Sequence, residues 1–146
     1  MWMAVGSWIE TVAQLENRLP EARKEIFLEV TRMVKDPNEL MADLGKGMVT
    51  LGDEAPELSA AFMRMDQAAY VEGEIERKYK ELIGLGIALY ARCEYCMNLH
   101  VKQALNEGAT REEILEACSV AVAFGGSPSM AYLSTTVLKA LDTFEE

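Results

Sequence analysis

The sequence predicts an all-α fold: a single-domain helical bundle of roughly six or seven helices that spans residues 1–146. Runs rich in Glu, Ala, Leu, Lys and Arg carry apolar residues at the three- and four-residue spacing of a helix face. Short breaks containing Gly or Pro separate these runs, and strand signals are nearly absent. No repeat or long linker divides the chain, whose 146 residues suffice for one core.

Start and stop residues predict where the helices begin and end. Asp36 followed by Pro37 is typical of an N-cap and a first helical residue. Thr110 followed three residues later by Glu113 is a capping box that starts another helix, and Gly108 suits the left-handed position after a helix. The predicted helices are 8–34 with a break at Pro20, 37–51, 57–70, 74–92, 96–107, 111–124 and 128–144, with turns at 52–56 and 125–128.

The charge balance argues against several classes of partner. Lys and Arg total 14 against 24 Asp and Glu, for a formal net charge of −10. Because nucleic acids and anionic membranes attract basic surfaces, neither is an expected partner. The longest apolar run, 82–91, is too short to span a membrane, and residues 1–6 lack the basic start and long apolar core of a signal peptide. A cytoplasmic protein is therefore expected.

The most informative stretch is Cys93-Glu94-Tyr95-Cys96-Met97-Asn98-Leu99-His100, which contains two of the three cysteines and the only histidine. A short break between two helices would place both thiols at the positive N-terminal end of the second helix, which favours the thiolate. His100 follows Cys96 by one turn on the same helix face, where it can accept or return a proton. An attacking sulfur, a resolving sulfur and a base are what reversible thiol–disulfide chemistry requires.

Two other interpretations of this motif stay open. The C-x-x-C spacing could be coincidental, with His100 at the surface. Alternatively, Cys93, Cys96 and His100 could supply three ligands to a structural zinc, with Cys118 or Glu81 completing the site. Structural zinc sites usually draw on two separated ligand pairs, and the chain has no second pair, so no metal is assigned.

Glu81 is the second unusual residue, because it lies on a helix face that is otherwise apolar. A carboxylate buried there is costly unless it is paired or functional. One interpretation makes Glu81 a base or proton store near neutral pH, because desolvation would raise the pKa of its carboxyl group. The other places it at the surface, paired with Arg77, Lys78 or Lys80.

Two further features are expected to be structural. Cys118 lies on an apolar stripe, which predicts a small core residue without chemistry. Gly84-x-Gly86 lies within a helix and follows no strand, so it is predicted to permit close helix packing rather than to bind phosphate. No cofactor is assigned.

These residues carry a resemblance to a known family. Glu81, Cys93, Cys96 and His100 together resemble the E-x11-C-x-x-C-x-x-x-H signature of the alkylhydroperoxidase D (AhpD-like) branch of the carboxymuconolactone decarboxylase family. The resemblance covers about residues 57–144. The supporting stretches are 80–83 before the pair, and 100–105, 108–116 and 125–128 after it.

The resemblance implies an all-α fold that assembles into rings, commonly trimers or hexamers. It also implies peroxidase or disulfide-reductase activity, with Cys93, Cys96, His100 and Glu81 as catalytic residues and the last two relaying protons. Cys96 is expected to attack first, because His100 is nearest to it in helical register, and Cys93 to resolve; the opposite order stays open.

The same resemblance suggests the partners. The substrate would be a peroxide or a disulfide, and an external dithiol, on a lipoylated protein or thioredoxin, would recharge the pair. Lactone decarboxylases share the fold but do not depend on such a pair. A decarboxylase-type lyase is therefore one alternative, and a non-catalytic helical assembly protein with a structural metal is another.

Composition independently predicts a homo-oligomer. Half of the residues are hydrophobic, and a helical chain of this size then has more apolar faces than a monomeric core readily consumes. Trp2 and Trp8 are the residues expected at a subunit contact.

Overall fold

The computed structural model describes residues 18–20, 23–24 and 35–145. The chain divides into two units, Met1–Lys35 and Asp36–Glu146, and each is considered by itself. The helix predicted over 8–34 falls almost entirely outside the described residues, and so do Trp2 and Trp8. The architecture below is that of the second unit.

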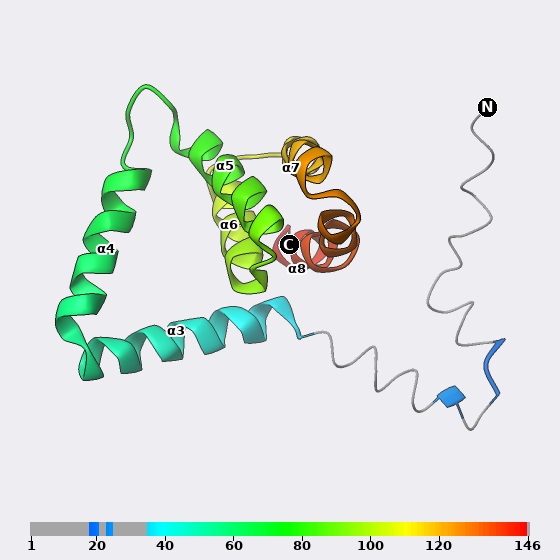
Figure 1. Cartoon of the computed structure of the whole chain (residues 1–146), viewed down its shortest axis with the longest axis horizontal. Helices are drawn as coiled ribbons and strands as arrows, with labels where there is room; N and C mark the ends of the chain where they lie inside the picture. Colours follow the sequence, from blue (N-terminus) through cyan, green and yellow to red (C-terminus); the bar gives the residue numbers. More distant parts are fainter. Residues whose placement is uncertain (1–17, 21–22, 25–34, 146) are drawn as a thin grey trace. The chain divides into compact units, whose positions relative to one another are not determined.

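In the described part of the second unit, every regular element is a helix (Figure 1), which confirms the predicted all-α class. The elements are α3 (Pro37–Glu54), α4 (Pro56–Tyr70), α5 (Arg77–Ala91), α6 (Glu94–Asn106), α7 (Arg111–Tyr132), the π-helical turn η2 (Leu133–Val137) and α8 (Leu138–Phe144).

Hydrogen bonds confirm two of the predicted helix boundaries, and a backbone angle confirms a third. The Asp36 carboxylate accepts from the backbone N–H of Asn38 at 2.9 Å and caps α3. At the start of α7 the Thr110 hydroxyl accepts from the N–H of Glu113 at 3.2 Å, and the Glu113 carboxylate accepts from the N–H of Thr110 at 2.9 Å. Gly108, just after α6, has a φ of 81°, which a glycine adopts without strain.

The turn predicted over 52–56 is wrong. Helix α3 continues to Glu54, and Ala55 alone separates it from α4. Pro56 is the first residue of α4, where a missing N–H costs no helical hydrogen bond. The proline ring disfavours helical geometry at the preceding residue, Ala55. The proline, rather than Gly52, therefore sets the break. Helix α5 also begins later than predicted, at Arg77.

The segment Arg111–Phe144 is long and apolar enough, by length and composition, to span a membrane. It is not one straight helix, because Gly126 interrupts it with a φ of 64° and a ψ of −149°, two residues before Pro128. This is the break predicted over 125–128. Buried residues on both sides of it, among them Ile114, Cys118, Val137 and Leu141, belong to the bundle core.

The core forms where α5, α6, α7 and α8 meet, with α5 in contact with both α6 and α7 (Figure 1). Its fully buried large side chains are Leu85, Leu89, Met97, Val101, Ile114, Val137 and Leu141. Burying each contributes about 1.5–3 kcal/mol of hydrophobic stabilisation. Helix α4 contacts α3 and α5 but has no buried residue of its own. The core therefore fixes α5 against α6, the two helices that carry the predicted site residues.

Candidate active site

The cysteine pair lies at the start of α6. Cys93 is its N-cap, Cys96 is in its first turn, and the two form a disulfide with a Cα–Cα distance of 5.3 Å. Arg92, just before them, adopts a left-handed φ of 59°, so the chain turns sharply from α5 into α6. The backbone N–H of Cys96 donates to Cys93 Sγ at 3.2 Å. The structure thus places both sulfurs at the positive end of a helix, where an anionic sulfur is favoured.

The three cysteines fall into two environments. Cys93 and Cys96 are partly exposed, whereas Cys118 is buried, as the sequence predicts. Burial raises the pKa of the Cys118 thiol to about 12. A thiol with that pKa stays protonated near neutral pH, and the thiolate is the reactive form. Of the three cysteines, Cys93 and Cys96 are therefore the two whose surroundings permit thiolate chemistry.

Glu81 of α5 and His100 of α6 form the polar centre of the site. The Glu81 Oε2 and His100 Nδ1 atoms are 2.8 Å apart, and their side chains are only 3% and 15% exposed. The alternative that placed Glu81 at the surface is therefore wrong. Arg77 does approach it, with its Nε 3.6 Å from Glu81 Oε1 and 3.3 Å from Glu107 Oε1. Two partners therefore offset the cost of burying this carboxylate.

The contact with Glu81 also determines which nitrogen of His100 can act as a base. An ionised carboxylate only accepts hydrogen bonds, so it binds the Nδ1–H of the imidazole. The neutral ring then keeps its basic lone pair on Nε2. A proton taken up at Nε2 would create an imidazolium beside the Glu81 carboxylate, which stabilises it.

Tyr70, the last residue of α4, belongs to the site although no sequence pattern points to it. Its ring stacks on the imidazole of His100, with centroids 5.7 Å apart and 23° between the planes. Burial, together with the negative charges of Glu81 and Asp66, raises the pKa of the Tyr70 hydroxyl above its usual 10.0. The hydroxyl is thus a neutral group beside the imidazole at physiological pH.

Gly84 leaves room for this stack. A Cβ atom at that position would lie 2.5 Å from the Tyr70 hydroxyl oxygen and 2.8 Å from Cε1 of His100. Contacts that short do not occur in folded proteins, so any side chain at position 84 would displace one of the two rings. The close packing predicted for Gly84-x-Gly86 is confirmed at Gly84, where the Tyr70 hydroxyl and the His100 imidazole both approach the glycine. A glycine inside an apolar helix was the only sequence signal of this contact.

Two lysines of α5 support the site from outside. Lys80 Nζ donates to the carbonyl oxygens of Ala69 at 3.0 Å and Val71 at 2.5 Å, and so holds the end of α4 that carries Tyr70. Lys78 Nζ pairs with Glu113 at 2.8 Å and ties α5 to the start of α7. Of the three basic residues considered as partners for Glu81, only Arg77 approaches it.

The four predicted site residues thus come from two packed helices, Glu81 from the start of α5 and the other three from the first two turns of α6 and its N-cap. Cys93 and Cys96 are bonded to each other, Glu81 contacts His100, and His100 follows Cys96 by one turn of α6. Within the described part of the chain, no group of three or more His, Cys, Asp or Glu side chains is arranged to hold a metal ion.

Fold and site together define a small helical protein with a cysteine pair at a helix N-terminus. Residues 56–138 match the carboxymuconolactone decarboxylase family, and the chain belongs to this family. It is 31% identical over 113 residues to an uncharacterized protein of Cupriavidus necator, covering 77% of this chain and 96% of that one. Uncharacterized protein 4 in the cox locus of Paracoccus denitrificans is also 31% identical, over 111 residues, covering 73% and 96% of the two chains.

Solved structures of the family share the fold. A carboxymuconolactone decarboxylase family protein from Legionella pneumophila superposes with a TM-score of 0.68 at 34% identity, covering 75% of this chain and 94% of that one. A family protein from Thermotoga maritima gives a TM-score of 0.65 at 28% identity, covering 72% and 90%. A role in the antioxidative response has been suggested for the Thermotoga protein.

Proposed function

We propose that this chain is a thiol-dependent oxidoreductase of the AhpD-like type, which reduces a peroxide or a disulfide in the cytoplasm. The observation that carries the proposal is a disulfide-forming pair at the start of α6, one turn before a histidine that a buried carboxylate orients. The antioxidative role suggested for the Thermotoga relative agrees with this chemistry. A decarboxylase-type lyase reaction would not use the cysteine pair.

In the first step the Cys96 thiol loses its proton to Nε2 of His100 and attacks one oxygen of the peroxide. A sulfur–oxygen bond forms and the O–O bond breaks. The leaving alkoxide takes the proton from His100 and departs as an alcohol, or as water if the substrate is hydrogen peroxide. Cys96 is oxidised by two electrons to a sulfenic acid, and the peroxide is reduced by the same two electrons.

In the second step Cys93 attacks the sulfenic sulfur of Cys96. The disulfide bond forms, and the hydroxyl group leaves as water with the proton of the Cys93 thiol. The N–H of Cys96, which donates to Cys93 Sγ, and the N-terminus of α6 favour the thiolate that performs this attack. The role of Glu81 in both steps is to hold His100 and to stabilise its protonated form.

An external dithiol completes the cycle. One of its sulfurs attacks the Cys93–Cys96 disulfide and forms a mixed disulfide, and its second sulfur then releases the reduced pair as the donor itself becomes a disulfide. A lipoyl group on a partner protein or a thioredoxin has the required chemistry. If the substrate is a disulfide, the same exchange runs in the opposite direction and no peroxide is consumed.

A peroxide-consumption assay with lipoamide and thioredoxin as alternative donors tests this function. Replacing Cys93 and Cys96 together by Ser should abolish turnover, whereas Cys118→Ala should retain it. If the double variant consumes peroxide as fast as the wild type, or if both proteins decarboxylate a small lactone acid equally well, the proposal fails.

Trapping the sulfenic acid tests the order of attack. A sulfenic-acid reagent should label Cys96 in the Cys93→Ser variant, because that variant lacks the sulfur that resolves the intermediate. Labelling of Cys93 in the Cys96→Ser variant alone would show that Cys93 attacks first.

A further inference from the structure

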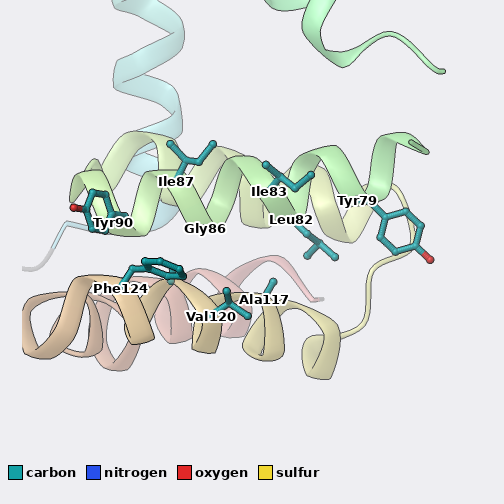
Figure 2. A pocket seen from close by; sticks show the side chains of 10 residues that line it. Tyr79, Leu82, Ile83, Gly86, Ile87, Tyr90, Ala117, Val120 and Phe124 are labelled. Carbon is teal, nitrogen blue, oxygen red and sulfur yellow. The ribbon is translucent and has the colours of Figure 1, made fainter. Parts of the chain in front are cut away.

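Helix α5 has one apolar side and one charged side. Toward α7 it lines an apolar groove, to which Leu82 of α5 and Val120 of α7 both contribute (Figure 2), and the ten residues that line this groove are all uncharged. Toward α6 it presents Arg77 and Glu81, which lie one turn apart. The proposed reaction uses Glu81 together with His100, but it gives no role to Arg77.

Arg77 lies between two carboxylates. Its Nε atom is 3.6 Å from Oε1 of Glu81 and 3.3 Å from Oε1 of Glu107. Among the described residues this nitrogen is buried and has no hydrogen-bond partner, so its attraction to the two carboxylates is that between opposite charges. The other oxygen of Glu81, Oε2, contacts Nδ1 of His100. The buried carboxylate therefore has a permanent cation on one oxygen and an imidazole on the other.

The positions of Arg77 and Glu107 oppose the dipoles of their own helices. Arg77 is the first residue of α5, at its positive end, and Glu107 is the C-cap of α6, at its negative end. Both side chains are more than a third exposed, so the ion pair between them adds little stability by itself. Local stability therefore does not explain these two charges, whereas the approach of Arg77 to Glu81 gives them a role in the site.

The imidazole by itself cannot keep Glu81 ionised through the whole proposed cycle. When His100 holds the proton of Cys96, the carboxylate faces an imidazolium and is paired. When His100 is neutral and ready to accept that proton, only Arg77 offers Glu81 an opposite charge. The Glu81 side chain is 3% exposed, and a carboxylate buried to that extent without a cation takes up a proton instead.

We propose that Arg77 is a positioning residue, which keeps the Glu81 carboxylate ionised while His100 is neutral and so keeps the basic lone pair of His100 on Nε2. A guanidinium suits this role because it stays charged throughout the cycle. Without it, the Glu81–His100 pair binds an additional proton at the same pH. If that proton sits on Glu81, the new O–H donates to Nδ1 and the ring hydrogen moves to Nε2. If it sits on the ring, both nitrogens carry hydrogen.

In both cases Nε2 of His100 carries a hydrogen and cannot accept the proton of Cys96. The loss of catalysis that follows rests on the proposed function, because it requires His100 to act as the base. The change at Nε2 does not, since it depends only on the charges around the pair.

Nitrogen-15 NMR of the His100 ring tests the inference without any substrate. His100 is the only histidine, and in the oxidised protein the cysteines of the Cys93–Cys96 disulfide do not titrate. Between about pH 6 and pH 9, Arg77→Gln should carry hydrogen on Nε2 in a larger fraction of molecules than the wild type at the same pH. Arg77→Lys restores the positive charge and should return the spectrum at least halfway to that of the wild type.

Arg111→Gln is the matched control. Arg111 is also the first residue of its helix, α7, and it also bridges two carboxylates, those of Asp142 and Glu145, at 2.8 and 2.6 Å. Its replacement removes the same charge but leaves the partners of Glu81 in place, so the His100 spectrum should match that of the wild type. Circular dichroism should show the same helical content in all three variants.

Turnover gives a second measurement. In the peroxide assay, Arg77→Gln should lose at least about tenfold in turnover, and Arg77→Lys should retain most of it. If the wild type reduces neither a peroxide nor a disulfide, the proposed function fails, but the spectra still decide the role of Arg77 because they need no substrate.

Three results would overturn the inference. The first is a His100 spectrum of Arg77→Gln that equals the wild-type spectrum at every pH. The second is an Arg77→Lys spectrum that equals that of Arg77→Gln, since the charge would then not be the cause. The third is an equal change in Arg111→Gln, which would mean that the net charge of the protein, and not the contact with Glu81, controls the ring.

Discussion

The Nδ1 atom of His100 lies 2.8 Å from the Oε2 atom of Glu81, across the contact between α5 and α6. Nineteen positions separate the two residues in sequence, so only the packing of these helices brings them together. Glu81 is only 2% exposed, so its carboxylate depends on the imidazole as a hydrogen-bond partner. In turn, the carboxylate fixes the orientation and tautomer of the imidazole.

Glu81→Gln should lower turnover about 100-fold, the scale of general acid–base catalysis, because the amide keeps the volume but removes the charge that stabilises protonated His100. His100 is the only histidine, so its ring signals can be followed by NMR, and they should shift in the variant. An unchanged His100 spectrum together with wild-type turnover would exclude Glu81 from the relay.

Gly84→Ala should disturb the site while Gly86→Ala should not. A Cβ at Gly84 would lie within 2.8 Å of both Tyr70 and His100 atoms, whereas a Cβ at Gly86 meets only Ala121 Cβ at 3.9 Å, an ordinary contact. Both changes gain about 1 kcal/mol in helix propensity. We expect Gly86→Ala to be as stable as the wild type or more so, and Gly84→Ala to lose about 10- to 100-fold in turnover. Melting temperatures and peroxide kinetics, measured side by side, check this; equal behaviour of the two variants would contradict it.

In the reduced protein, the thiols of Cys93 and Cys96 should be alkylated rapidly and the thiol of Cys118 slowly. Burial raises the pKa of Cys118 to about 12, so almost none of it is thiolate near neutral pH. Cys93 and Cys96 are partly exposed at a helix N-terminus and should react first. Peptide mapping after iodoacetamide treatment identifies the sites, and all three thiols should react in denaturant. Rapid labelling of Cys118 in the native protein would show that its surroundings open readily.

The ion pair between Lys78 and Glu113 should make stability depend on pH at the acid end. The hydrogen bond from Lys78 lowers the pKa of Glu113, so the folded state binds this proton less readily than the unfolded state. The pair therefore contributes its full stability above the unfolded pKa of about 4.3, and that contribution is lost as the pH falls through the lowered folded value. As the pH is lowered from about 7 to about 3, the melting temperature of Lys78→Met should fall less steeply than that of the wild type.

The matched control for that experiment is Lys46→Met. Lys46 is an exposed lysine of α3, so this substitution removes the same charge without breaking the ion pair. It should leave the acid dependence of the melting temperature as it is in the wild type. An identical pH profile for Lys78→Met and wild type would show that the pair contributes nothing in solution.

Helix boundaries were predictable where neighbouring residues decide them. Asp36 and the box formed by Thr110 and Glu113 cap their helices through bonds that span two or three residues, so the sequence pattern contains the whole interaction. The break at Gly126 followed from the same local chemistry. The turn predicted around Gly52 was wrong because glycine only weakens a helix, whereas Pro56 ends one.

The candidate site was predictable only in part. The spacing of Cys93, Cys96 and His100 identified one face of one helix, but whether Glu81 is buried depends on how α5 packs, so the sequence left both interpretations open. Tyr70 could not be identified at all. Its place beside His100 results from where α4 ends and from the lysine that holds that end, and these are tertiary contacts without a local pattern.

The proposed redox role of the Cys93–Cys96 pair is tested by titrating the fully reduced protein with one equivalent of peroxide, followed by thiol counting and peptide mass mapping. Two of the three thiols should disappear and one new disulfide should join Cys93 to Cys96, while Cys118 remains reduced. Three intact thiols after excess peroxide and after excess disulfide, or oxidation confined to Cys118, would contradict it.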